Sequence, residues 1–249
     1  MILEIRKWYR SKRIFLLIFI CSLMGISAPL FTYYSKDILK NMGGYDASNI
    51  LLPPPTWISA TVSYFKNVEQ VVVFIVIFIV VETCLLGKNE SLKLFYKTNA
   101  KTPSKIYTPK LSAGLLFSFL GLLIGDLLNT YMLWALFDNK VHFRHLAIAL
   151  TIQMIVFLIL IVLGATIGIY TSSAFLSAVV VEGFLIITGL LSNVALFKNW
   201  SPMLLLSPIQ FLSTNVEVDQ IWRPLIVGCI VLILCGILIK RRRISRQEN

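Results

Sequence analysis

The chain has 249 residues, of which 57% are hydrophobic and only 14% are charged, and its mean hydropathy is +0.80. A water-soluble domain of this length would surround one core with charged side chains, so this is not the composition of a soluble enzyme or binding module. The net charge of +11 does not indicate nucleic-acid binding either, because the basic residues are grouped between long apolar runs. We therefore predict an all-α integral membrane protein, with residues 1–249 forming a single membrane domain.

Six apolar runs are long enough to cross ~30 Å of hydrocarbon at about 1.5 Å per residue. A basic amphipathic stretch precedes the first run, and it predicts an interfacial helix leading into a span rather than a cleaved signal peptide. The predicted spans are residues 14–34, 68–86, 111–137, 146–171, 173–197 and 221–240.

The basic residues also predict the orientation of the chain. Sixteen of the 23 Lys and Arg residues fall in segments 6–13, 88–110 and 240–246. Segments rich in Lys and Arg stay on the cytosolic side, so we expect a multi-pass plasma-membrane protein with both termini in the cytosol.

Three segments are then expected outside the cell: two long ones and the short turn that contains the two histidines. Residues 35–67 are predicted to form the first outer loop, because Gly-Gly and Pro-Pro-Pro sequences disfavour regular structure. In the loop 198–221, the short apolar stretch 203–206 either dips into the outer leaflet or belongs to a plain loop. Three aromatic residues of the first loop are expected at the membrane interface: Trp57, Tyr64 and Phe65.

Small residues four apart predict close helix packing in two spans. Gly121 and Gly125 lie in the third span, and Gly164 and Gly168 lie in the fourth. We expect these faces to pack within the chain, with a dimer seam as the alternative. Only residues 171–172 join spans four and five, which predicts a tight antiparallel hairpin.

Signatures of catalysis and metal binding are missing from the sequence. There is no G-x-x-x-x-G-K-[ST] phosphate loop, so ATP hydrolysis by that route is not expected in this chain. His142 and His145 are predicted to lie in a short outer turn, and two histidines alone make a poor metal site. The four cysteines lie in apolar runs, where we expect core residues rather than disulfides. We predict no catalytic residue, metal or cofactor in this chain.

Two carboxylates fall inside predicted spans. Asp126 lies in the third span and Glu182 in the fifth, where a charge costs at least ~2.5–3.5 kcal/mol. Such groups either line a polar translocation path or are protonated, paired with each other or hydrogen-bonded in a structural role. Candidate hydrogen-bond partners are Asn129, Gln153 and Asn193, and the candidate path residues are Asp126, Glu182, Asn129 and Asn193.

The loop between spans two and three carries the strongest signal. Residues 91–101 have the periodicity of a short amphipathic helix, which Pro103 would end. Such a helix suits docking into a cytosolic partner, and a basic helix lying on anionic lipid is the alternative. One face carries Leu92, Phe95, Tyr96 and Asn99, and a neighbouring stripe carries Lys93, Lys97 and Lys101.

At this loop the chain resembles the type-2 permeases of ATP-binding-cassette (ABC) transporters. Those proteins have an acidic residue at the end of span two, a glycine, a short coupling helix, a Pro-Ser-Arg/Lys element and a lysine before span three. The matching residues here are Glu82, Gly87, Leu92, Pro103, Ser104, Lys105 and Lys110. The resemblance extends in outline over the whole chain, although Lys105 stands where an arginine is more usual.

The resemblance implies the permease subunit of a bacterial ABC exporter. Its partners would be a cytosolic ATPase subunit that holds ATP and Mg²⁺, a second permease of the same or a different kind, and membrane lipid. Phe95 and Tyr96 would anchor the coupling helix in the ATPase, and Glu82 would pair with Lys105 or Lys110. The expected cargo is apolar or amphipathic, such as a peptide, bacteriocin or antibiotic.

Three other functions fit the sequence less well. An ion-coupled transporter or channel would use Asp126 and Glu182. A toxin-immunity membrane protein would bind its target through the outer loops and tolerate loss of the cytosolic helix. A membrane enzyme is the third alternative, although no catalytic constellation is visible.

Overall fold

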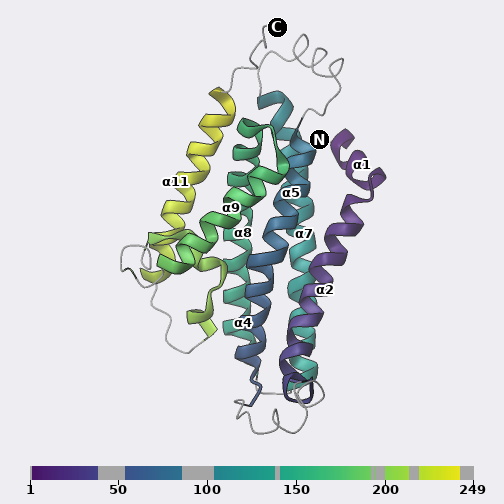
Figure 1. Cartoon of the computed structure of the whole chain (residues 1–249), viewed down its shortest axis with the longest axis vertical. Coiled ribbons are helices and arrows are strands. Elements are labelled where there is room, and N and C mark those ends of the chain that lie inside the picture. Colours follow the sequence, from purple (N-terminus) through teal and green to yellow (C-terminus); the bar gives the residue numbers. More distant parts are fainter. Residues whose placement is uncertain are drawn as a thin grey trace.

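A computed structural model describes residues 2–38, 54–85, 104–137, 141–191, 194, 200–212 and 219–241. These residues form helices and their connections, with no strand among them (Figure 1). The all-α prediction is therefore confirmed for the described chain. The elements are α1 (Ile2–Arg10), α2 (Arg13–Tyr33), α4 (Trp57–Asn67), the π-helical segment η1 (Val68–Val72), α5 (Val73–Cys84), α7 (Ser104–Phe137), α8 (Phe143–Thr171), α9 (Ala174–Leu190), the 3₁₀ turns η4 (Pro202–Leu206) and η5 (Ile209–Leu212), and α11 (Asp219–Arg241).

By length and composition, five helices in the described chain can cross a membrane. The predicted span at residues 173–197 is shorter than expected, because α9 has only 17 residues. At about 1.5 Å per residue it covers roughly 25 Å, which is less than a typical hydrocarbon core. The five helices of spanning length are Arg13–Tyr33, Trp57–Cys84, Lys105–Phe137, Phe143–Thr171 and Ile221–Arg241.

The predicted outer loop at residues 35–67 is wrong for its last eleven residues, which form α4. Thr56 caps this helix in a capping box: its hydroxyl accepts from the Ser59 amide at 3.1 Å, and the Thr56 amide donates to the Ser59 hydroxyl at 3.0 Å. The chain then continues through η1 into α5 without interruption. Tyr64 and Phe65 are consequently buried in the core, whereas the sequence analysis placed them at the membrane interface.

Two more helices begin earlier than predicted. Helix α7 starts at Ser104, so Ser104, Lys105 and Lys110 belong to its first turns rather than to a loop. Helix α8 starts at Phe143, so the two histidines flank and begin a helix instead of forming an outer turn. In both cases the first turn of the helix is polar, and a hydropathy pattern detects only the apolar part of a helix.

Close helix packing occurs at the glycines that the sequence identified. A Cβ on Gly125 would lie 2.9 Å from the backbone oxygen of Cys21, and one on Gly121 would collide with Leu17, both on α2. A Cβ on Gly164 would lie 2.6 Å from Ile77 of α5. Both glycine pairs therefore pack within the chain, as predicted.

The tight turn between α8 and α9 is confirmed. Ser172 has a left-handed backbone with φ of 56°, and Ser173 caps α9 by accepting from the Leu176 amide at 3.2 Å. Behind the turn, the Ser177 hydroxyl donates to the Gly164 carbonyl and ties the two helices together. Helix α9 runs obliquely across the bundle in Figure 1.

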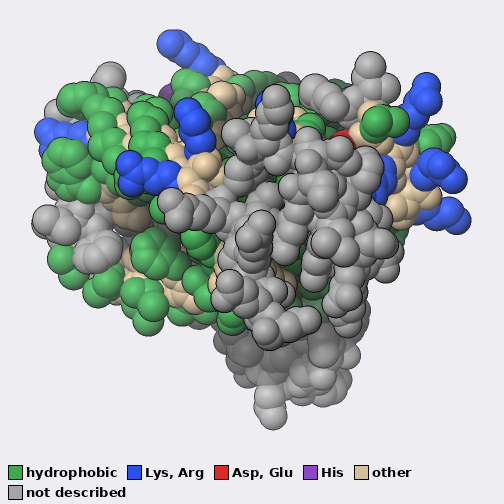
Figure 2. All heavy atoms as spheres, turned by 90° about the horizontal axis from the view of Figure 1, so that it is seen from above, with side chains coloured by type: hydrophobic (Ala, Val, Ile, Leu, Met, Phe, Trp, Pro, Cys, Tyr) green, Lys and Arg blue, Asp and Glu red, His purple; other side chains and the backbone are tan. Residues whose placement is uncertain are grey.

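One end of the bundle is basic. Helix α1, the end of α5, the start of α7 and the end of α11 lie together at the top of Figure 1. Figure 2 looks onto this end and shows Lys and Arg side chains around its rim, above flanks that are mostly hydrophobic. We call this the basic end of the molecule.

Candidate functional site

Several predicted site residues lie outside the described residues. They are Gly87, Leu92, Phe95, Tyr96, Pro103 and Asn193, and the side chain of Ser104 is also not described. The predicted coupling helix at residues 91–101 therefore stays a prediction. Both ends of its loop are described, and they lie at the basic end of the molecule.

The two ends of this loop are joined by what we call the loop stem, formed by Arg13, Glu82, Leu85 and Lys110. The Arg13 guanidinium lies 3.2 Å from the Glu82 carboxylate, with the two side chains 29% and 50% exposed. We expected Glu82 to pair with Lys105 or Lys110, and its ion-pair partner in the described chain is instead Arg13. The pair ties the start of α2 to the end of α5.

Lys110 has a different role in the loop stem. It lies in α7, is only 4% exposed, and donates from Nζ to the carbonyl of Leu85 at 3.4 Å. Leu85 is the C-cap of α5, where carbonyl groups lack helical partners and the helix dipole favours a positive charge. The hydrogen bond of Lys110 thus connects Leu85, where the loop begins, with α7, the helix that follows the loop.

Helix α1 packs beside the loop stem. Its Trp8 side chain is buried, and the indole ring lies 5.3 Å from the ring of Phe117 on α7. On the other side of the helix, Leu3 and Tyr9 are exposed. Trp8 fixes α1 against the bundle, and the basic residues of this helix are exposed, as predicted for an amphipathic helix.

Asp126 is buried inside the bundle, with 5% of its surface exposed. The Tyr64 hydroxyl donates to its Oδ1 at 2.7 Å, across the contact between α4 and α7. Asn129 lies one turn further along α7 and is completely buried. Asp126 Oδ2 and both amide atoms of Asn129 have no hydrogen-bond partner among the described residues. Asp126 and Asn129, two of the four candidate path residues, therefore lie in the interior of the chain, and Asp126 is hydrogen-bonded to Tyr64.

Glu182 lies near the middle of α9 and is half-buried. Its charged neighbour is Glu69, in the π-helical segment of the helix that runs from Trp57 to Cys84. The Ser207 hydroxyl, just after η4, donates to Glu69 Oε2 at 2.6 Å. Asp126 thus has a hydrogen-bond partner in Tyr64, whereas Glu182 Oε2 has none among the described residues.

Glu69 was not among the site residues predicted from the sequence. The predicted span began at residue 68, which placed Glu69 at the membrane edge. With the helix starting at Trp57, Glu69 lies twelve residues inside it, or roughly 18 Å at 1.5 Å per residue. The available signal was Thr56 followed three residues later by Ser59, a capping pattern that extends the helix toward its N-terminus.

The segment between α9 and α11 packs into the bundle where it is described. Leu205 and Leu206 of η4 and Phe211 and Leu212 of η5 are buried, and both turns contact α8. These contacts show that the segment folds onto α8, and its dip into the outer leaflet stays a prediction.

No group of three His, Cys, Asp or Glu side chains suitable for a metal occurs in the described part of the chain. His142 and His145 have ring centroids 6.1 Å apart, and the ring of Trp57 lies 5.9 Å from that of His142. These contacts are those of an aromatic cluster at the end of the bundle.

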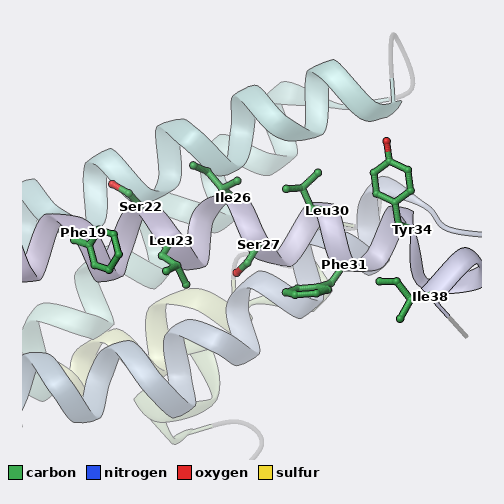
Figure 3. Close-up of a pocket in the computed structure, with 9 residues that line it drawn as sticks. All are labelled: Phe19, Ser22, Leu23, Ile26, Ser27, Leu30, Phe31, Tyr34 and Ile38. Atoms are coloured by element: carbon green, nitrogen blue, oxygen red, sulfur yellow. The ribbon is translucent and has the colours of Figure 1, made fainter. Parts of the chain in front are cut away.

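An apolar groove runs along the exposed side of α2 (Figure 3). Its volume is about 640 Å³, and Ser22 and Ser27 contribute the small side chains along it. The remaining lining residues are Phe19, Leu23, Ile26, Leu30, Phe31, Tyr34 and Ile38.

No family model, curated protein or solved structure matches the chain. A functional assignment therefore depends on the loop stem, the buried carboxylates and the apolar surfaces described above.

Proposed function

We propose that this chain is the permease subunit of an ATP-driven ABC exporter in the plasma membrane. In this proposal the basic end faces the cytosol, and α9 with the residues after it provides a sixth crossing. ATP and Mg²⁺ bind to a separate ATPase subunit, and a second permease completes the translocation unit. The cargo is apolar or amphipathic, with peptides, bacteriocins and antibiotics as candidates.

The observation that carries this proposal is the loop stem. A lever that transmits force from an ATPase must begin and end on elements that move with the spans. Here the loop begins at Leu85, whose carbonyl accepts from Lys110 of α7, and Arg13 links the same end of α5 to α2. Displacement of the loop would therefore reach α2, α5 and α7 together.

The charge distribution supports the proposed orientation. Lys and Arg side chains surround the basic end, as expected for a cytosolic surface. The half-exposed Arg13–Glu82 pair is worth only about 0–1 kcal/mol, so we assign it a positioning role rather than a stabilising one.

The groove along α2 supports an apolar cargo. It is lined almost entirely by aliphatic and aromatic side chains. We propose that this face of α2 lines the path between two permeases, where an amphipathic cargo would exchange contacts with lipid for contacts with the groove.

Paired substitutions in the loop test the proposed ATPase contact. Phe95→Ala combined with Tyr96→Ala should abolish permease-stimulated ATP hydrolysis while the protein still inserts into the membrane. A matched control at the same end is Leu3→Ala combined with Tyr9→Ala, since both side chains are exposed on α1. If the loop variant stimulates ATP hydrolysis as well as the control does, the coupling-helix assignment is wrong.

Charge reversal separates ATPase docking from lipid anchoring. If residues 91–101 only lie on anionic lipid, Lys93→Glu combined with Lys97→Glu should damage function more than loss of the aromatic pair. The proposal predicts the opposite order, and the same hydrolysis assay measures it.

The Glu69–Glu182 pair favours one alternative function, an ion-coupled transporter. Both side chains lie within apolar helices, where a carboxyl group is costly to ionise, so they are suited to exchange a proton. For such a transporter, Glu182→Gln would abolish transport. For an ABC permease, the same variant should leave stimulation of the ATPase intact.

A further inference from the structure

The buried polar groups around Asp126 have more hydrogen-bonding capacity than the described chain satisfies. Asp126, Asn129 and Gln153 are at least nine-tenths buried, and Asn129 and Gln153 are completely buried. Five of their polar atoms have no partner among the described residues: Asp126 Oδ2 and both amide atoms of Asn129 and of Gln153. Buried polar atoms are nearly always satisfied, so a group of this size is a place where water or an ion binds.

These side chains lie at similar depth. The end of α7 and the starts of α4 and α8 lie together at the lower end of Figure 1. At about 1.5 Å per residue, Asp126 and Asn129 lie roughly 16 and 12 Å from the end of α7, and Gln153 lies roughly 15 Å from the start of α8. Tyr64 lies roughly 10 Å from the start of α4 by the same measure.

The helix faces also bring them together. Tyr64 reaches Asp126 directly, and Asn129 follows Asp126 by three residues, which places both on one side of α7. Gln153 precedes Gly164 by eleven residues, close to three full turns, so it lies on the same face of α8. Helix α8 also contacts α7, the helix that carries Asp126 and Asn129.

We propose that Tyr64, Asp126, Asn129 and Gln153 form a binding site for a hard monovalent cation, represented by Na⁺, inside the helix bundle. Asp126 Oδ2 supplies the negative charge, and the amide oxygens of Asn129 and Gln153 supply neutral ligands. The Tyr64 hydroxyl occupies Oδ1 and orients the carboxylate so that Oδ2 is directed to the ion.

The donor set determines the class of ligand. Carboxylate and amide oxygens suit hard cations, and no cluster of soft or imidazole ligands accompanies them in the described chain. One carboxylate balances one positive charge, whereas a divalent ion would leave an uncompensated charge in a medium of low dielectric constant. No ion pair between Asp126 and a Lys or Arg is found in the described chain. A bound cation would therefore not have to displace a basic side chain from Asp126.

Cation-dependent thermal stability tests this site without requiring any ATPase. The full chain is purified in mild detergent and heated with a thiol-reactive fluorescent dye, because Cys21, Cys84 and Cys235 are buried and react on unfolding. NaCl is titrated against choline chloride at constant ionic strength and pH. At Na⁺ concentrations about a hundredfold above Kd, the midpoint should have risen by about 5–10 °C, and it should keep rising with the logarithm of the Na⁺ concentration.

Variants assign the effect to the site. Asp126→Asn should remove the Na⁺-dependent rise, and Gln153→Leu should weaken or remove it if the first variant does not fold. Thr151→Val is the matched control, because Thr151 is exposed on the same helix two residues away and should keep the full rise.

Three results would overturn the proposal. The first is an unfolding midpoint that does not depend on Na⁺. The second is a Na⁺ effect that Asp126→Asn and Gln153→Leu both retain. The third is a midpoint that follows pH alone, which would mean that a proton neutralises Asp126. Failure here leaves the exporter proposal standing, because the assay contains no ATPase and does not involve the loop at residues 86–103.

Discussion

Gly125 lies at a close approach of α2 and α7, and an alanine there should push the helices apart. The new Cβ would lie 2.9 Å from the backbone oxygen of Cys21 and 3.2 Å from the hydroxyl of Tyr64. Ordinary contact begins near 3.4 Å, so the backbones must separate by roughly 0.5 Å. No rotamer change can relieve a collision with a main-chain oxygen.

The net effect of Gly125→Ala follows from two opposing contributions. Overpacking costs about 1–3 kcal/mol, and replacing glycine within a helix returns roughly 0.5–1 kcal/mol. We expect a net loss of about 1–2 kcal/mol, or roughly 2–8 °C in the unfolding midpoint in detergent. Gly183→Ala is the matched control, because nothing lies within 4 Å of its Cβ position, and it should be neutral or stabilising. Equal midpoints for the two variants would refute the proposed close packing of α2 and α7.

Four further substitutions test three individual contacts. Tyr64→Phe removes the hydroxyl that donates to buried Asp126 and should lower the unfolding free energy by about 1–3 kcal/mol; an unchanged midpoint would mean that Asp126 is satisfied in another way. Thr56→Ala removes the cap of α4 and should cost about 1 kcal/mol in the same assay, and no loss would argue against a helix start at Trp57. Arg13→Gln and Glu82→Gln should each change stability by less than about 1 kcal/mol, with a double-mutant coupling that shrinks in high salt. A coupling well above that value would show that the pair is more than a positioning contact.

The sequence was informative wherever hydrophobicity alone determines the structure. Long apolar runs predicted an all-helical chain, and Gly121 and Gly164 correctly marked faces that pack within it. The two-residue connection before α9 left no alternative to a tight turn, and Ser172 provides it with a left-handed backbone.

Helix starts and polar partners were harder to predict. Prolines before Thr56 were interpreted as the end of regular structure, although they precede a well-capped helix. That error placed Tyr64 at the membrane interface and concealed its hydrogen bond to Asp126, which joins residues 62 positions apart. The ion pair between Glu82 and Arg13 could not be predicted either, because the choice among several basic residues depends on which helices pack together.

The central claim is that a separate ATPase drives this chain through the loop at residues 86–103. The most direct test isolates the tagged protein from its native membrane in mild detergent and identifies stoichiometric companions by mass spectrometry. We predict a nucleotide-binding subunit at about one copy per permease, and Phe95→Ala combined with Tyr96→Ala should reduce its recovery. If no nucleotide-binding protein is recovered, even after cross-linking, the exporter proposal is contradicted.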